Sequence, residues 1–366
     1  MKIGKFFLAA CGCLFLARAA CAREPLWKIA LGSEIAGAPA AFASQALVAT
    51  KGGLLVALGE DGRIAWKQKL PGGCLAAPAV DRDGSVYVAG ADGTLLRFSA
   101  AGKELWRASL GQVLPATPLP GERSVFQVGG EGRVWRVRKQ DGRIEKTAEL
   151  GIPVHASPVW DSARKNLLVP AKDYFLLAVD QELGVRWRFR TAGVNFAPAA
   201  VTPAGEIYCS SMGRTLHKLA ADGRPLWGYR TQGWIKASPV VDSEGRAYVG
   251  CYDRHVYALD AGGRPRWKFF GKAQFTAGAV LDGNGRLYCG DTSGTVYALD
   301  RSGRKAWEYK SPDFITGDLT ILPGRVLLAG SIDGTLLAFR VERPMSRRAW
   351  WAKSLGNLMN SGFDEN

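Results

Sequence analysis

Short apolar runs separated by glycine-containing turns recur along almost the whole chain. Residues 236–267 read KASPVVDSEGRAYVGCYDRHVYALDAGGRPRW, and residues 276–307 read TAGAVLDGNGRLYCGDTSGTVYALDRSGRKAW, with the same order of parts. Each copy has a segment of small residues, an apolar run after an acidic and Gly-containing turn, a second apolar run, and then Gly, Arg and Trp. The stretch is therefore one supersecondary unit that repeats.

The period of the repeat can be counted on the aromatic residue that closes each unit. The intervals between closing positions are 39, 40, 40, 41, 40, 40, 40 and 43 residues. Periods of about 40 to 45 residues with several short strands in each unit are typical of β-propeller blades. We therefore predict an all-β fold, an eight-bladed β-propeller with four-stranded antiparallel blades. The closing positions are Trp27, Trp66, Trp106, Lys146, Trp187, Trp227, Trp267, Trp307 and Trp350.

Each unit places its strands in a fixed order. Small residues before a proline, as in Ala237-Ser238-Pro239, precede the innermost strand, where the blades converge on a central axis. Turns such as Asp92-Gly93 favour hairpins between the second and third strands. The connection from the third to the fourth strand contains a glycine that we expect to have positive φ. These glycines are Gly62, Gly102, Gly142, Gly184, Gly223, Gly263 and Gly303.

The closing tryptophans are interpreted as structural docking residues. Burying one Trp removes roughly 150 to 250 Å² of surface from water, and a constant period points to architecture before ligand binding. The third unit has Lys146 instead, so we expect that blade to be the least stable or to be covered. The segment that starts at the closing position occurs nine times, whereas eight blades need only eight. The first copy starts at Trp27 and the last at Trp350. One of them should complete blade eight, with the chain ends meeting there.

The ends of the chain suggest a division into three parts. Residues 1–22 combine two Lys, an apolar run and the sequence Ala20-Cys21-Ala22, which is typical of a cleaved signal peptide. A lipobox-like sequence ending at Cys11 leaves a lipid anchor as the alternative. Residues 23–355 form the propeller, and residues 356–366 are a polar tail for which we expect disorder. No later apolar run approaches the ~20 residues of a membrane span, and we expect a monomer.

Charge and cysteine content narrow the function. The net charge is +15, and residues 97–146 carry ten Lys or Arg against five Asp or Glu. An exported basic surface suits anionic lipid, lipopolysaccharide, polysaccharide or an acidic protein face, while nucleic acid is not expected because no binding module is present. No zinc-type or haem-type cysteine motif occurs. The four cysteines of the mature chain are interpreted as buried small residues: Cys74, Cys209, Cys251 and Cys289.

The repeat from Ala258-Leu259-Asp260 through Gly263-Arg264 to Trp267 resembles the tryptophan-docking repeat of the pyrroloquinoline-quinone (PQQ) type β-propellers. This resemblance covers roughly residues 27–355. The family includes quinoprotein dehydrogenases and non-enzymatic propellers such as the BamB-like group, which this layout resembles most. The resemblance to the dehydrogenases would imply PQQ with calcium, but the adjacent cysteines and long insertions of those enzymes are missing. In three units the docking alanine is replaced by Arg97, Arg136 and Lys218.

Several residues could line a functional site, although no catalytic or metal-binding set is predicted. Eight positions before the innermost strands should form a ring at one mouth of the channel, and a polar arc of it could grip an anion or a peptide. Asp318 stands where other units have Ser or Gly and could face the axis as a base. Exposed aromatics near blade links, including Trp160, would suit a protein-binding face. The site candidates are His155, Asn195, Trp234, Lys236, Tyr252, Phe275, Thr276 and Asp318, and the other ring positions are Ala36, Leu75, Pro115 and Thr316.

These observations favour a non-enzymatic scaffold at the cell envelope, in the periplasm or associated with the outer membrane. Its partner would be an envelope protein. The resemblance to the BamB-like group implies that this partner is a β-barrel assembly component. No cofactor is expected. A PQQ-dependent dehydrogenase or PQQ binder is the first alternative. Binding of an anionic polysaccharide or lipopolysaccharide through the Arg-rich third blade is the second.

Overall fold

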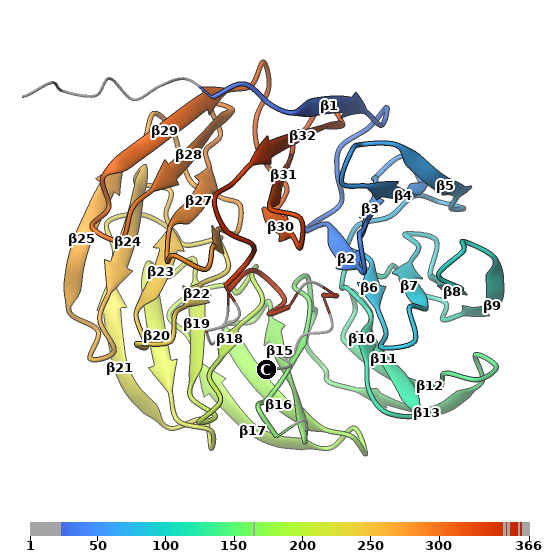
Figure 1. The fold of residues 1–366 in the computed structure, drawn as a ribbon. Helices are drawn as coiled ribbons and strands as arrows, with labels where there is room; N and C mark the ends of the chain where they lie inside the picture. Colours follow the sequence, from blue (N-terminus) through green and yellow to red (C-terminus); the bar gives the residue numbers. More distant parts are fainter. Residues whose placement is uncertain (1–22, 164, 347–348, 350–351, 358, 361–366) are drawn as a thin grey trace, which may run out of the picture.

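The computed structural model describes residues 23–163, 165–346, 349, 352–357 and 359–360. The predicted signal peptide and Trp350 lie outside these residues. Within these described residues, thirty-two strands form eight four-stranded antiparallel sheets. The sheets stand around a central axis as the blades of a propeller (Figure 1), so the predicted all-β, eight-bladed fold is confirmed. The described residues include no helix long and apolar enough to cross a membrane.

The first four blades run in chain order, each from the axis outward. Blade one contains β2 (Ala40–Phe42), β3 (Gln45–Ala49), β4 (Leu54–Gly59) and β5 (Ile64–Lys69). Blade two contains β6 (Ala79–Val80), β7 (Val86–Ala89), β8 (Thr94–Phe98) and β9 (Glu104–Ser109). Blade three contains β10 (Leu119–Pro120), β11 (Ser124–Val128), β12 (Arg133–Arg138) and β13 (Ile144–Glu149). Blade four contains β14 (Val159–Trp160), β15 (Asn166–Ala171), β16 (Phe175–Asp180) and β17 (Val185–Arg190).

The remaining blades continue the same order until the ring closes. Blade five contains β18 (Ala200–Val201), β19 (Ile207–Ser211), β20 (Thr215–Leu219) and β21 (Pro225–Arg230). Blade six contains β22 (Val240–Val241), β23 (Ala247–Gly250), β24 (His255–Leu259) and β25 (Pro265–Phe270). Blade seven contains β26 (Val280–Leu281), β27 (Leu287–Gly290), β28 (Thr295–Leu299) and β29 (Lys305–Lys310). Blade eight contains β30 (Thr320–Leu322), β31 (Val326–Gly330), β32 (Thr335–Arg340) and β1 (Trp27–Ala30).

The N-terminal strand closes the ring. Trp27 pairs with Ala338, and β1 runs antiparallel to β32 as the outermost strand of blade eight. The first and last strands of the ring therefore share one sheet, which leaves no open gap between blades. The chain after Arg340 does not run alongside β1, so the expected meeting of both chain ends at this sheet is wrong. It turns instead toward the axis (Figure 1).

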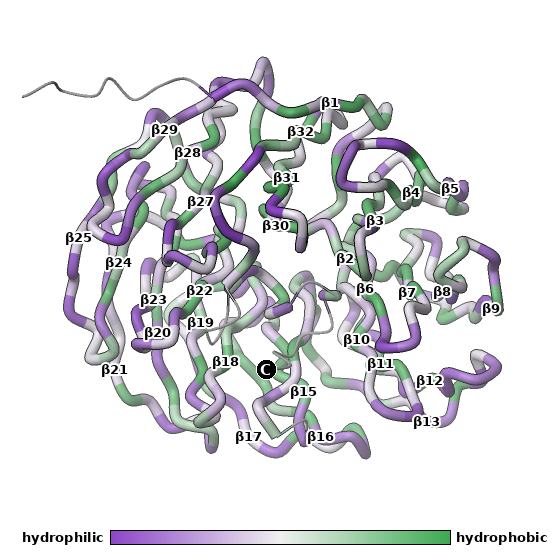
Figure 2. The backbone as a smooth tube through the Cα atoms, in the orientation of Figure 1, coloured by the Kyte–Doolittle hydropathy of each residue, from purple (hydrophilic) through white to green (hydrophobic). Residues whose placement is uncertain are grey.

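The core lies between neighbouring blades. One buried cluster joins Ile35 and Val56 of the first blade region to Leu328 and Leu336 of blade eight. Hydrophilic stretches gather on the outer strands and turns (Figure 2). The middle strands are buried on both faces, which is why the sequence shows continuous apolar runs there instead of strict alternation.

Five docking tryptophans each join their blade to the next one through the same geometry. The indole N–H of Trp66 donates to the carbonyl oxygen of Ala100 over 3.0 Å, and Gly102 follows in the same turn. Gly102 has a φ of +80°, and a Cβ built there would lie 2.5 Å from the Trp66 ring. Glycine is therefore required for both backbone conformation and space. The same indole bond is made by Trp27, Trp106, Trp227 and Trp267.

Blade four departs from the predicted turn. Six of the seven glycines expected to have positive φ do have it, but Gly184 does not. In that turn the left-handed position is taken by Leu183, whose φ is +62°. The turn is displaced by one residue relative to the sequence alignment of the units, and Leu183 is buried in the core between blades three and four.

Candidate functional site

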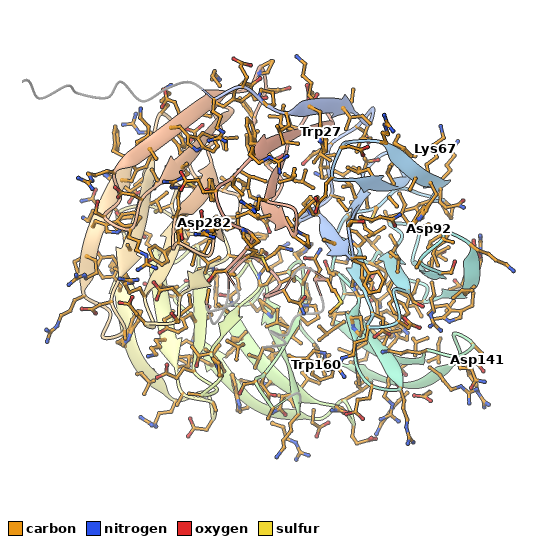
Figure 3. All side chains as sticks on the ribbon, in the orientation of Figure 1. Trp27, Lys67, Asp92, Asp141, Trp160 and Asp282 are labelled. Atoms are coloured by element: carbon orange, nitrogen blue, oxygen red, sulfur yellow. The ribbon has the colours of Figure 1, made fainter. Side chains whose placement is uncertain are left out.

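The two faces of the ring carry different connections. Because neighbouring strands within a blade are antiparallel, the links between blades and the turns from second to third strands lie on one face. We call this the Trp234 face, after a residue in the link from β21 to β22. The turns from first to second and from third to fourth strands lie on the other face, which we call the Asp282 face (Figure 3).

Trp234 and Tyr252 form an aromatic pair on the Trp234 face. Their ring centroids are 5.8 Å apart, and the ring planes are inclined by 55°. The backbone N–H of Tyr252 donates to the carbonyl oxygen of Trp234 over 2.9 Å, so the link and the neighbouring turn are tied together. Trp234 still has 47% of its surface exposed. An aromatic pair that the backbone holds in place and that faces solvent is suited to bind another protein.

Cationic side chains flank this pair. Lys236 and Arg254 are exposed, and the Arg254 guanidinium lies 4.6 Å from the ring centroid of Phe270. The neighbouring Asp253 is engaged internally, since it accepts hydrogen bonds from the Tyr257 hydroxyl and the Gln232 backbone. Burial alone would raise the pKa of Asp253, but hydrogen bonds from the Tyr257 hydroxyl and the His255 backbone lower it. The link and the turn that carry the pair therefore also carry two exposed cations, while the carboxylate of Asp253 is bonded internally.

Other large apolar side chains are exposed on the same face, and the sequence analysis missed most of them. Val113 and Phe314 occupy the position of Trp234 in their own links. That alignment was a signal that could have found them. The exposed set also includes residues from the turns between second and third strands. Its members, exposed by 37% to 53%, are Leu75, Val113, Tyr174, Phe314 and Ile332.

Two predicted surface aromatics are buried instead. Phe275 is fully buried and packs against Phe269 and Tyr297. It stands at the link position of Ile235, which is also fully buried, so the expectation of an exposed Phe275 is wrong. Trp160 is 1% exposed at the end of β14, where its indole donates to the carbonyl oxygen of Pro120 (Figure 3).

Of the ring of residues predicted at the channel mouth, the structure brings only His155 and Lys236 to a shared neighbour, Phe196. His155 and Lys236 both approach Phe196, at 6.4 Å between ring centroids and 5.9 Å from the Lys236 ammonium. Burial and the nearby Lys172 lower the pKa of His155, which favours its neutral form at neutral pH. The remaining members are mixed. Ala36 is buried, Leu75 is exposed, and Pro115, Thr276 and Thr316 are half-buried.

Asn195 is a structural residue of this ring. It is 2% exposed, and its side-chain amide donates to the carbonyl oxygen of Phe175 over 3.0 Å. The bond ties the link between blades four and five to the start of β16. A side chain held in this way cannot reach a ligand at the mouth.

Asp318 does face the axis, but its carboxylate is engaged. It accepts the backbone N–H of Gly278, and it lies near the buried ammonium of Lys353, whose charged form it favours. A calcium ion takes about six to eight oxygen ligands, whereas the described residues contain no group of three His, Cys, Asp or Glu that could hold a metal. A carboxylate with a resident ammonium beside it does not fit calcium-bound quinone.

The cysteines are buried and unreactive, as predicted. All four are free and buried. Burial raises the pKa of Cys74 and Cys251 to about 11 and that of Cys209 to about 12. A thiol that is rarely ionised is a poor nucleophile or metal ligand.

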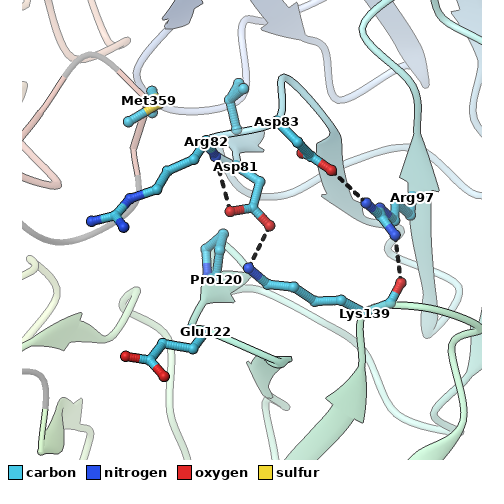
Figure 4. Close-up of a pocket in the computed structure, with 10 residues that line it drawn as sticks. Asp81, Arg82, Asp83, Arg97, Pro120, Glu122, Lys139 and Met359 are labelled. Carbon is cyan, nitrogen blue, oxygen red and sulfur yellow. Dashed lines mark hydrogen bonds and ion pairs between the residues drawn. The ribbon is translucent and has the colours of Figure 1, made fainter.

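A charged pocket of about 380 Å³ opens on the Asp282 face between blades two and three (Figure 4). Arg97 pairs with Asp83 at 2.8 Å, and Lys139 pairs with Asp81 at 2.5 Å. Burial opposes ionisation of Asp83, but hydrogen bonds from Ser85 and the charge of Arg97 lower its pKa. The cations and anions of the pocket satisfy one another, so this pocket has no large excess of either charge.

The basic third blade is likewise paired. Arg136 and Lys146 both contact Glu182 of blade four, at 2.6 and 3.0 Å. Arg138 pairs with Asp141 at 2.6 Å, and Arg133 pairs with Glu149. The excess of Lys and Arg seen along this stretch therefore does not form a bare cationic surface.

Eight four-stranded blades, closed by the N-terminal strand and joined by docking tryptophans, define the class of this protein as an eight-bladed β-propeller with PQQ-type repeats. The family model described as "Outer membrane protein assembly factor BamB" matches residues 18–118, 176–272 and 252–350. The chain belongs to that family, because these matches cover well over half of it.

Solved structures agree on the fold. BamB from Moraxella catarrhalis has a TM-score of 0.74 at 17% identity, with 87% of this chain and 100% of that chain covered. Sqt1 from Saccharomyces cerevisiae has a TM-score of 0.76 at 14% identity, with 88% and 100% covered. The computationally designed Ika8 protein has a TM-score of 0.73 at 14% identity, with 87% and 100% covered. No curated protein matches the chain by sequence.

Proposed function

We propose that this protein is an exported, non-catalytic scaffold that binds a protein of the cell envelope through the Trp234 face. The description of its family model supports a role in outer-membrane protein assembly, in which the partner is a β-barrel assembly component. The scaffold works by holding loops in fixed positions on a rigid ring and needs no cofactor.

The observation that carries this proposal is the pair formed by the exposed Trp234 and the half-buried Tyr252. Buried aromatic residues at the centre of an interface supply much of its binding free energy, and Trp and Tyr are enriched among such residues. The pair lies on the same face as Phe314 and the other exposed apolar side chains. The cations Lys236 and Arg254 next to the pair favour a partner segment that is acidic as well as apolar.

The two alternatives lack a comparable site. A PQQ-dependent dehydrogenase would need a metal-bound quinone beside a base, and Asp318 is already bonded to Gly278 with an ammonium nearby. Binding of an anionic polysaccharide would need accessible cations, and most of the basic residues of blade three are paired with Glu149, Glu182 and other acids.

The proposal is tested by binding of purified variants to the partner captured from the envelope. The change Trp234→Ala should weaken binding by about 2 kcal/mol, roughly thirtyfold, if the residue is a hot spot. Leu226→Ala is the matched control, because Leu226 is 41% exposed on the outer strand of the preceding blade, away from this face. Equal binding by both variants and the unaltered chain would exclude the Trp234 face.

A further inference from the structure

The described residues of the C-terminal segment, 343–346, 349, 352–357 and 359–360, lie at the propeller axis and belong to no blade. The segment leaves β32 and runs toward the middle of the ring, as the dark red trace shows (Figure 1). The ring does not need this segment to close, because β1 already supplies the fourth strand of blade eight. Because β1 takes this place in blade eight, the described residues of the segment are an addition to a complete propeller.

The first part of the segment contacts the backbone at the edge of the innermost strand of blade seven. The carbonyl oxygen of Ala352 accepts the N–H of Leu281 over 2.9 Å, and the N–H of Ser346 donates to the carbonyl oxygen of Leu281 over 2.9 Å. The carbonyl oxygen of Pro344 accepts the N–H of Gly283. These contacts form isolated bridges rather than a strand. They recognise polypeptide backbone and not a particular side chain.

The second part crosses the axis to other blades. The Ser354 hydroxyl lies 3.0 Å from the Ser238 hydroxyl of blade six. The carbonyl oxygen of Met359 accepts the N–H of Val80 in blade two over 2.8 Å. Asn360 is fully buried, and its amide donates to the carbonyl oxygens of Ala38 and Pro78, at 2.9 and 3.0 Å.

Two side chains of the segment, those of Lys353 and Asn360, also make polar contacts at the axis. Lys353 is fully buried, and its ammonium contacts the side-chain oxygen of Asn360 and the carbonyl oxygens of Pro39 and Asn357. The carboxylate of Asp318 lies nearby. Buried polar groups must be matched by partners, so the axis selects an occupant that brings a cation and an amide to these two places.

We propose that the propeller axis is a binding site for a polypeptide that carries a lysine and, seven residues later, an asparagine, with a tight turn between them, and that the described residues of the C-terminal segment occupy this site in cis. The chain's own segment then competes with a segment of the same chemistry from another polypeptide. This site uses none of the exposed side chains of the Trp234 face, so it stands or falls independently of the proposed scaffold function.

The first step of the test asks whether the segment is held as described. In the full-length chain, Asn360→Ala removes the bonds to Ala38 and Pro78. Hydrogen–deuterium exchange at the amides of Val80 and Leu281, which both donate to the segment, should become at least about tenfold faster. Arg343→Ala, in the same segment with an exposed side chain, is the control and should leave both amides unchanged.

The second step adds a synthetic peptide with the sequence of residues 349–360, AWWAKSLGNLMN. It should bind the Asn360→Ala chain, restore protection at Val80 and Leu281, and bind the unaltered chain at least about tenfold more weakly because the resident segment competes. The same peptide with alanine at its last position should not restore protection.

Each other result contradicts the proposal. Unchanged exchange in the Asn360→Ala chain would mean that Asn360 does not hold the segment. Fast exchange that the peptide fails to reverse would mean that the axis is not a peptide site. If Asn360→Ala does not fold, Ser354→Ala replaces it. Losing only the bond to Ser238 should raise exchange at Leu281 roughly two- to fivefold, reversible by the peptide.

Discussion

Arg136 donates a hydrogen bond of 3.0 Å to the carbonyl oxygen of Gln181 in the next blade. The docking indole of Trp106 in blade two likewise donates to the corresponding carbonyl oxygen of blade three, that of Lys139, over 2.7 Å. Blade three has no tryptophan at this place, and Arg136 supplies the missing link. In blade two, both Arg97 and Trp106 donate to the carbonyl oxygen of Lys139. An arginine at this position can therefore make the bond to the next blade when the tryptophan is missing.

This substitution of a guanidinium for an indole predicts that Arg136 stabilises the ring. Arg136→Ala should lower the free energy of unfolding by about 1 to 2 kcal/mol, since it removes the bond to Gln181 and leaves Glu182 with one partner fewer. Urea denaturation would measure the change. Arg143→Ala, an exposed position of the same blade, should change stability by less than about 0.5 kcal/mol. Equal effects of the two variants would contradict this role for Arg136.

Two glycines separate the effect of backbone conformation from that of space. Gly102 and Gly111 have φ values of +80° and +72°, but only Gly102 faces a tryptophan ring. Gly111→Ala should cost about 1 kcal/mol for its conformation alone. Gly102→Ala should cost roughly 1 to 3 kcal/mol more, because its methyl group displaces Trp66. Denaturation of both variants tests this, and similar losses would show that docking is not close-packed.

Lys353 predicts an unusual dependence of stability on pH. Burial lowers the pKa of its ammonium to about 7, against an ordinary value of 10.5, and Asp318 offsets part of that effect. Between these values the unfolded chain holds more protons than the folded one, so stability should rise with pH. From about pH 7.5 to 9 the gain relative to Lys353→Met should reach up to ~2 kcal/mol.

The pH prediction is measured by chemical denaturation of both chains at the two pH values. Comparing the chains removes the contribution of groups that titrate identically in them. A difference that stays constant with pH would mean that the Lys353 ammonium is hydrated in the folded protein.

Cofactor binding is open to a simple test. PQQ added with calcium should leave the thermal midpoint of the full-length chain unchanged, because any ligand that binds the folded state would raise it. A rise that depends on both PQQ and calcium would favour the dehydrogenase alternative. The change Asp318→Asn would then show whether that carboxylate takes part.

The sequence predicted most of the fold because each blade repeats the same physical solution. The period of the docking tryptophans and the glycines that face them is visible without a structure, and the number of blades follows. The turn between the third and fourth strands of blade four could not be predicted in this way. Gly184 aligns with the glycines of the other units, but the turn is displaced by one residue, so Leu183 has the positive φ.

The candidate site was harder to predict, since neighbouring link positions face opposite ways. Ile235 and Phe275 point into the core, whereas Trp234 and Phe314, one position earlier in their links, are exposed. Hydrophobicity alone cannot separate them, but alignment of the links can. The C-terminal segment could not be placed from sequence, because its polar residues suit disorder in water equally well. Only the buried carbonyl oxygens at the axis explain why Lys353 and Asn360 are buried.

The central claim is that the Trp234 face binds an envelope protein. The most direct measurement replaces Trp234 with a photo-reactive amino acid in the living cell, cross-links the envelope, and identifies captured proteins by mass spectrometry. The same residue at Leu226 serves as the control. We expect a β-barrel assembly component to be captured from position 234 and not from position 226. Capture of that component from both positions alike, or of none from position 234, would contradict it.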